Sequence, residues 1–216
     1  MLENRCIIVA FVPQNIYNCG IGATKMNIEL IEKICKGNNG YVTDQMVKKN
    51  KIPTIVITRL VRKGVLFKVA RGVYLHKDYP EDQLFTFCLA YSKFVYSKNT
   101  ALYLNNLSNR RMTKIYVNVP RNYNLNIVPE GVVINRVNEV NYKLGLIDLE
   151  TPFGNKVKSY DKERCICDLF LFDNDLEEIK FALNEYIKGS YDIVKLYEYA
   201  KQLKIYERVK LIIELL

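Results

Sequence analysis

The sequence predicts an α+β protein made of two parts. Three short helical patterns followed by two short β-rich runs fill residues 27–75. Alternating apolar and polar runs, typical of strands, recur between residues 114 and 159, and the spacing is helical again from residue 161. Three helices and a hairpin are the order of a winged helix-turn-helix. The expected divisions are an N-terminal extension at 1–26, a winged helix-turn-helix DNA-binding domain at 27–78, and a mixed α/β C-terminal domain with a helical tail at 79–216.

The centre of the first part runs from Pro53 to Gly64 and predicts an amphipathic helix. Proline is tolerated in the first helical turn, and glycine often ends a helix. Helical spacing gives this stretch two faces, one with Ile57, Leu60, Val61 and Gly64, the other with Ile55, Thr58, Arg59 and Arg62. The first face can be buried, while the second presents two guanidinium groups, a hydroxyl and methyl groups. A helix that reads the DNA major groove needs this division.

Two alternatives remain open for this stretch. The five residues from Thr54 to Thr58 are all β-branched, and such residues favour strands over helices. A helix with one apolar and one basic face is also commonly an ordinary surface helix whose charged face is solvated.

The two preceding helices are predicted from their caps. Asn27 is expected to cap a helix that ends at Gly37, and the apolar positions of this helix are Ile28, Ile31, Ile34 and Cys35. Residues 37–40 read as a turn. Thr43 is expected to cap a second helix, which has Asp44 in its first turn and Met46 and Val47 on its buried face.

A β-hairpin is expected after the basic helix. Residues 65–69 and 73–75 are rich in β-formers, and a glycine-containing turn joins them. Lys68 and Arg71 are expected at or near the tip, where a wing would touch DNA backbone or minor groove. Winged helices also bind proteins, so an interaction adaptor or a transcription regulator of another kind remains an alternative.

Twelve residues are the candidates for contacting DNA. The residues expected to face the groove are Thr54, Ile55, Thr58, Arg59 and Arg62, with arginine on guanine and Ile55 or a threonine methyl on a thymine methyl. The others, expected at or near phosphates, are Thr43, Lys48, Lys49, Lys51, Lys63, Lys68 and Arg71.

The charge distribution supports an anionic partner for the first part. Residues 1–80 hold 13 Lys/Arg against five Asp/Glu, whereas residues 81–216 hold 19 against 18. Such asymmetry indicates nucleic acid before membrane. A basic surface that only keeps the protein in solution is the alternative.

Composition and spacing argue against several other classes. The six cysteines form no CxxC pair and His76 is the only histidine, so we expect no metal, no cofactor and no Cys–His or Ser–His–Asp nucleophile. Scattered cysteines fit reduced thiols in the cytoplasm. The apolar run at 6–12 is too short to span a membrane and does not read as a signal peptide. Met26 directly precedes the first clear helix signal, which suggests that the natural start lies there.

A short linker is expected at 76–80, across the boundary between the two parts. A helix is predicted over 82–96, and Ser97 is expected to cap a short helix over 100–102. Strands are predicted at 114–119 and 131–137, followed by a hairpin of 144–151 and 155–159 around the turn 152–154. Helices are predicted at 161–172, 175–188, 190–203 and 205–216.

Three charged features of the second part have competing explanations. Arg110, Arg111, Lys114 and Arg121 surround one predicted strand, and they either protect a sheet edge or contact nucleic acid. Arg164 and Asp168 have the i, i+4 spacing of an ion pair on a helix surface or between elements. Asp173-Asn174-Asp175 is a D-x-D pair that could hold a metal for nucleotidyl transfer, but its place between helical patterns favours a helix cap, so we expect no enzyme.

The order of these motifs resembles the AbiEi-type antitoxins of abortive-infection, type IV toxin–antitoxin systems. GYVTDQMVKKNKIPTIVITRLVRKGVLFKVARGVYL at 40–75 is similar to the N-terminal domain of that family. The stretches similar to its C-terminal domain are YSKNTALYLNNL at 96–107, KIYVNVP at 114–120 and SYDKERCICDLF at 159–170. The resemblance covers about residues 28–172 well and the helical tail loosely.

The resemblance implies a bacterial phage-defence protein with two activities. Its N-terminal domain would bind inverted repeats in its own promoter and repress the operon. Its C-terminal domain would be required to neutralise a nucleotidyltransferase toxin encoded next door, without a stable complex being implied. Double-stranded DNA and the toxin are thus the expected partners, and no membrane is expected.

Overall fold

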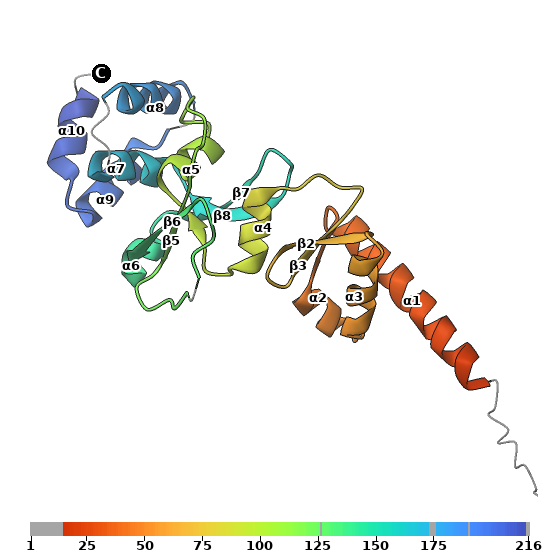
Figure 1. Cartoon of the computed structure of the whole chain (residues 1–216). Coiled ribbons are helices and arrows are strands. Elements are labelled where there is room, and N and C mark those ends of the chain that lie inside the picture. Colours follow the sequence, from red (N-terminus) through yellow and green to blue (C-terminus); the bar gives the residue numbers. More distant parts are fainter. Residues whose placement is uncertain (1–14, 126, 173–175, 190, 215–216) are drawn as a thin grey trace, which may run out of the picture. The chain divides into compact units, whose positions relative to one another are not determined.

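The computed structural model of the chain describes residues 15–125, 127–172, 176–189 and 191–214. These residues fall into two compact units, Met1–Pro80 and Glu81–Leu216, and each is described here by itself (Figure 1). Among the described residues, no helix is both long and apolar enough to cross a membrane.

The described residues of unit 1 form three helices and a small antiparallel sheet. Its elements are α1 (Asn15–Gly37), β1 (Tyr41–Thr43), α2 (Asp44–Lys49), α3 (Thr54–Arg62), β2 (Leu66–Ala70) and β3 (Val73–His76). The strand order is β1-β3-β2, so β3 is the middle strand. The turn predicted at 37–40 is present at 38–40, because Gly37 is still the last residue of α1, and Gly40 is in the left-handed region. Strand β1 was not predicted, because three residues are too few to show periodicity and this strand exists only by pairing with β3.

The start of α1 and the end of β3 correct two sequence predictions. Asn27 was expected to cap α1, but the helix begins at Asn15 and passes through Asn27, so the predicted boundary at residue 26 lies inside a helix. A capping signal depends on one residue, and an asparagine inside a helix costs only a few tenths of a kcal/mol, about 0.7 at most. His76 was assigned to a linker, but it is the last residue of β3 and pairs with Leu66. The apolar run at 6–12 lies outside the described residues.

Unit 2 is built on a five-stranded mixed sheet. Its strands are β4 (Val95–Tyr96), β5 (Ile115–Pro120), β6 (Val132–Val137), β7 (Leu146–Glu150) and β8 (Lys156–Tyr160), in the order β6-β5-β4-β8-β7. Its helices are α4 (Gln83–Ala90), α5 (Lys98–Leu104), α6 (Glu139–Lys143), α7 (Lys162–Phe172), α8 (Leu176–Lys188), α9 (Ile193–Gln202) and α10 (Tyr206–Glu214). The β5 and β6 strands are parallel, as are β4 and β8, whereas β7 and β8 form the predicted hairpin.

Helices cover both faces of this sheet. Helix α7 contacts α5, α8, α9 and α10, and these helices gather at one end of the unit in Figure 1. Along β5, Ile115, Val117 and Val119 are buried on one face, in a cluster that also receives Leu84 of α4. Val95, on the other face, joins the cluster around α7.

The element bounds confirm several predictions for unit 2. The four C-terminal helices, the hairpin and strands β5 and β6 have the predicted type and lie within a few residues of the predicted positions.

Two predictions for unit 2 are wrong. The helix expected over 82–96 ends at Ala90, and Val95–Tyr96 forms the central strand β4. Its aromatic and β-branched residues are strand formers, and the phenol of Tyr96 donates a hydrogen bond to the carbonyl of Leu84. In addition, Arg110, Arg111, Lys114 and Arg121 do not protect a sheet edge, because β5 lies between β6 and β4 and the edges are β6 and β7.

A buried arginine of α7 pairs with an aspartate of the same helix and also ties α7 to the α6 segment. Arg164 Nε donates to Asp168 Oδ1 at 2.8 Å, and the side chains are only 3% and 2% exposed. This pair was predicted on a helix surface or between elements; the partner is right, but the two residues belong to the same helix and are buried rather than on its surface. Arg164 Nη1 also donates to the carbonyls of Asn141 at 2.7 Å and Leu144 at 3.0 Å. Burial disfavours the charge of Arg164, but the Asp168 carboxylate outweighs burial and raises the arginine pKa.

The substitution Arg164→Ala should lower the free energy of unfolding by about 3–5 kcal/mol, because it leaves the Asp168 carboxylate buried without its cation. Urea unfolding followed by circular dichroism measures this loss. The matched control is Lys143→Ala, which removes the exposed i, i+4 partner of Glu139 at 2.9 Å. The control should change stability by no more than about 0.5 kcal/mol. Equal effects of the two substitutions would contradict the assigned role of burial.

Candidate nucleic-acid interface

Helix α3 forms although its first five residues are β-branched. Val56, Ile57 and Leu60 are 3–5% exposed and pack into one core cluster with residues of α1, α2 and the sheet. Burying each such side chain stabilises the fold by roughly 1.5–3 kcal/mol. A β-branched residue costs a helix at most about 0.7 kcal/mol. Burial therefore outweighs propensity, and the strand alternative is wrong.

The outward face of α3 carries the residues predicted to face a groove. Thr54, Ile55, Thr58, Arg59 and Arg62 are all exposed, with Ile55 51% exposed. The Thr58 hydroxyl donates to the Thr54 carbonyl at 3.4 Å, within the same helix. Two guanidinium groups and apolar methyl groups thus share one solvent-exposed helix face.

The turn between α2 and α3 is tightly fixed. Asn50 donates from its backbone to the Met46 carbonyl at 3.1 Å and from its side chain to the same oxygen at 2.9 Å. Lys51 takes a left-handed conformation with φ 56°, and the Ile52 N–H then reaches the Val47 carbonyl at 3.0 Å. The chain enters α3 at Pro53, whose fixed φ suits a helix start. These bonds set the direction in which α3 leaves α2.

The C-terminal end of α3 is also fixed by backbone hydrogen bonds and a residue with positive φ. Lys63 donates to the Arg59 carbonyl and Gly64 to the Val61 carbonyl, both at 3.0 Å. Gly64 has φ 68°, a left-handed conformation that favours glycine and stops the helix. The sequence predicted this stop correctly. As a result Lys63 lies exposed just beyond the arginine-bearing face.

The hairpin after α3 is anchored to the start of α2. Strands β2 and β3 pair antiparallel, with an irregularity between Lys68 and Ala70. The Gly72 carbonyl accepts the Asp44 N–H at 2.9 Å, and a Cβ on Gly72 would lie 2.9 Å from the Asp44 carboxylate. Arg71 is exposed at the tip, as predicted, and Lys68 is exposed on β2 opposite Tyr74. The hairpin tip therefore keeps a fixed place beside α2.

The candidate set includes eight exposed cations. They are Lys48, Lys49, Lys51, Arg59, Arg62, Lys63, Lys68 and Arg71. Within the part of the chain that the structure describes, none of them forms an ion pair. Their charges are therefore directed to solvent, which is the state in which surface cations meet phosphate groups.

Thr43 differs from the other eleven candidates. It is 8% exposed, and its hydroxyl oxygen accepts the Met46 N–H at 3.2 Å, as expected of an N-cap. The structure therefore gives this side chain a capping role, and any contribution to DNA binding stays a prediction.

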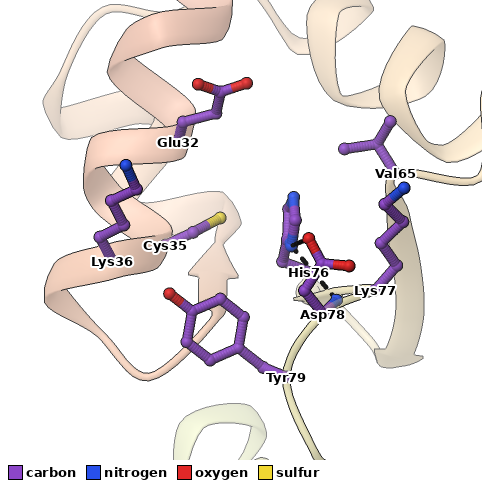
Figure 2. Close-up of a pocket in the computed structure, with 8 residues that line it drawn as sticks. All are labelled: Glu32, Cys35, Lys36, Val65, His76, Lys77, Asp78 and Tyr79. Atoms are coloured by element: carbon purple, nitrogen blue, oxygen red, sulfur yellow. Dashed lines mark hydrogen bonds and ion pairs between the residues drawn. The ribbon is translucent and has the colours of Figure 1, made fainter.

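A hollow in unit 1 was not foreseen from the sequence (Figure 2). Its volume is about 600 Å³, and it lies between α1 and the end of β3. Figure 2 shows Glu32, Cys35 and Lys36 on one side and His76 and Asp78 on the other. Residues this far apart in sequence give no periodic signal, so only the fold reveals the hollow.

The cysteine and the histidine of this hollow show no sign of reactivity or metal binding. Burial raises the pKa of the Cys35 thiol to about 11, so little reactive thiolate exists near neutral pH. His76 Nδ1 accepts the Asp78 N–H at 3.3 Å and lies 3.6 Å from the Asp78 carboxylate. No group of His, Cys, Asp and Glu in the described residues suits a metal ion, and the Asp173-Asn174-Asp175 motif lies outside them. We assign the hollow no chemistry.

The strongest candidate site is thus the exposed face of α3 with the cations on either side of it. No protein-family model and no curated protein matches the chain, so the function proposed below depends on this geometry and on the sequence resemblance.

Proposed function

We propose that the chain is a DNA-binding autorepressor and the antitoxin of a bacterial abortive-infection operon. In this proposal residues 27–78 are a winged helix-turn-helix, and α3 enters the major groove. One observation carries it: α3 buries Val56, Ile57 and Leu60 while its opposite face exposes Arg59 and Arg62. A reading helix requires this combination of a fixed inner face and a basic outer face.

The side chains on the outer face suit base edges. Arginine donates two parallel hydrogen bonds to the O6 and N7 atoms of guanine, the commonest specific contact in the major groove. Arg59 and Arg62 are three residues apart and therefore neighbours on the helix surface. Ile55 and the Thr58 methyl supply apolar contacts of the kind that a thymine methyl group accepts.

The remaining cations suit the phosphate backbone. Lys48, Lys49 and Lys51 lie at the end of α2 and in the turn before α3, while Lys68 and Arg71 belong to the hairpin. Cations on both sides of a reading helix fix its register on the duplex without reading sequence. The order helix, strand, helix, helix, hairpin supports the winged-helix assignment.

The antitoxin half of the proposal depends on the resemblance to the AbiEi-type family. Residues 79–216 would act in the cytoplasm to neutralise a nucleotidyltransferase toxin, with no stable complex required. A toxin gene beside this one is the expected genetic context. Co-expression with that toxin, with and without residues 79–216, tests this half through rescue of growth.

A protein-interaction adaptor is the second candidate. Ile55 and Phe67 are 51% and 54% exposed on unit 1, and exposed apolar side chains of this size are common at protein interfaces. Such an adaptor would bind a partner protein and leave DNA unshifted.

The substitution Arg59→Ala should weaken specific DNA binding by about 1–3 kcal/mol and relax base preference at one position, because one bidentate guanine contact is lost. A gel-shift titration against DNA upstream of the gene, with a scrambled duplex alongside, measures both effects. Lys33→Ala, which removes an exposed cation of α1, is the control and should leave base preference unchanged. An unaltered affinity and footprint for Arg59→Ala would remove this residue from the reading face.

A double substitution of Lys48 and Lys49 by alanine should weaken binding to specific and scrambled DNA alike. The slope of log K against log salt is negative, and each lost phosphate contact reduces its magnitude by about 0.9. The double substitution should therefore make the slope shallower by up to about 1.8. Titrations at several salt concentrations give the slope. Lys25→Ala with Lys33→Ala removes the same charge from α1 and serves as control. If both variants changed the slope equally, net charge rather than position would explain the binding.

A further inference from the structure

A small basic hollow in unit 2 is lined by none of the residues proposed to bind DNA. It is about 50 Å³ in volume and lies between the start of α5 and the segment that leads into β5. The lining residues that matter here are Asn99, Ser108, Arg110, Arg111, Thr113 and Lys114. Its size admits a few water molecules or one small oxyanion, and it is too small for a nucleobase.

The walls of this hollow are held by partly buried contacts. Ser108 donates to Glu178 Oε1 at 3.2 Å, and Arg110 Nη1 lies 3.0 Å from Glu178 Oε2. The Glu178 side chain is 2% exposed, so it fixes the segment from the protein interior. On the other side, the Tyr116 N–H donates to Thr100 Oγ1 at 2.9 Å and docks α5 on β5. The hollow is therefore shaped before any ligand arrives.

The cations of this hollow do not protect an edge strand of the sheet. Lysine and arginine commonly guard edge strands, but β5 is an inner strand. Arg111 and Lys114 are exposed and form no ion pair within the described residues. No acidic residue is among the described residues that line the hollow, whereas Thr113 and Asn99 add a hydroxyl and an amide.

We propose that this hollow binds a phosphate group, carried by a nucleotide or by a nucleic-acid backbone. A guanidinium, an ammonium and neutral hydrogen-bond donors around a space of this size match a phosphate, whose oxygens accept several charge-assisted bonds. This site goes beyond the proposed function, because it belongs to unit 2 and needs no DNA contact by α3.

Amide resonances of the ¹⁵N-labelled full-length chain, titrated with inorganic phosphate, test the proposal. Saturable shifts are expected at Asn99 and at residues 108–116. The paired substitution Arg111→Ala and Lys114→Ala should weaken this binding at least about tenfold, since each lost charge-assisted bond contributes more than 1 kcal/mol. Lys93→Ala with Lys156→Ala removes the same charge from exposed positions outside the lining and should leave the binding unchanged.

Two further probes distinguish the sources of the phosphate. AMP should shift the same resonances with weak salt dependence if the site takes a nucleotide. A single-stranded RNA oligonucleotide with hydroxyl ends should bind more tightly, with a steep salt dependence, if the site takes a backbone phosphate.

Absence of saturable shifts with all three probes would overturn the proposal, as would shifts that persist in the Arg111 and Lys114 variant. The result is independent of the proposed repressor function, because the Arg59→Ala chain should bind phosphate in this hollow as well as the unsubstituted chain does.

Discussion

Burial of one face of α3 is the constraint on which the first unit depends. Val56, Ile57 and Leu60 meet residues of α1, α2 and β2 in a single cluster, and this contact decides that a β-branched stretch is helical. It also decides which residues face outward, because helical geometry places Arg59 and Arg62 on the face opposite the buried residues. Packing energy in the core thus determines the chemistry of the surface.

The fixed turns around α3 extend this constraint to the neighbouring cations. Asn50 and Lys51 set the α2–α3 angle, and the bond from Asp44 to Gly72 holds the hairpin beside α2. Long lysine side chains lose rotamer entropy when they bind, so a rigid backbone beneath them reduces what must be ordered on binding. These few hydrogen bonds therefore preorganise the backbone that carries the basic side chains.

Elements with a periodic pattern of apolar residues could be predicted from the sequence. Elements that form only by pairing with residues distant in the chain could not. The face of α3 and the four C-terminal helices followed from helical spacing, and the end of α3 followed from Gly64. Strands β1 and β4 contain three and two residues and exist only through pairing. Spacing alone related Arg164 to Asp168, but burial of that pair needs the carbonyls of the α6 segment around it.

Net charge is a poor guide to local sites, and the two units illustrate why. Unit 1 has an excess of positive charge that can be read from the sequence, whereas residues 81–216 are nearly balanced. In unit 2 the nearly equal numbers of acidic and basic residues are distributed unevenly. Glu178 is buried against Arg110, while Arg111 and Lys114 are exposed around a hollow. Because a buried carboxylate satisfies one cation and leaves its neighbours to solvent, a neutral unit can still present a strongly basic hollow. Folding, rather than composition, creates that site.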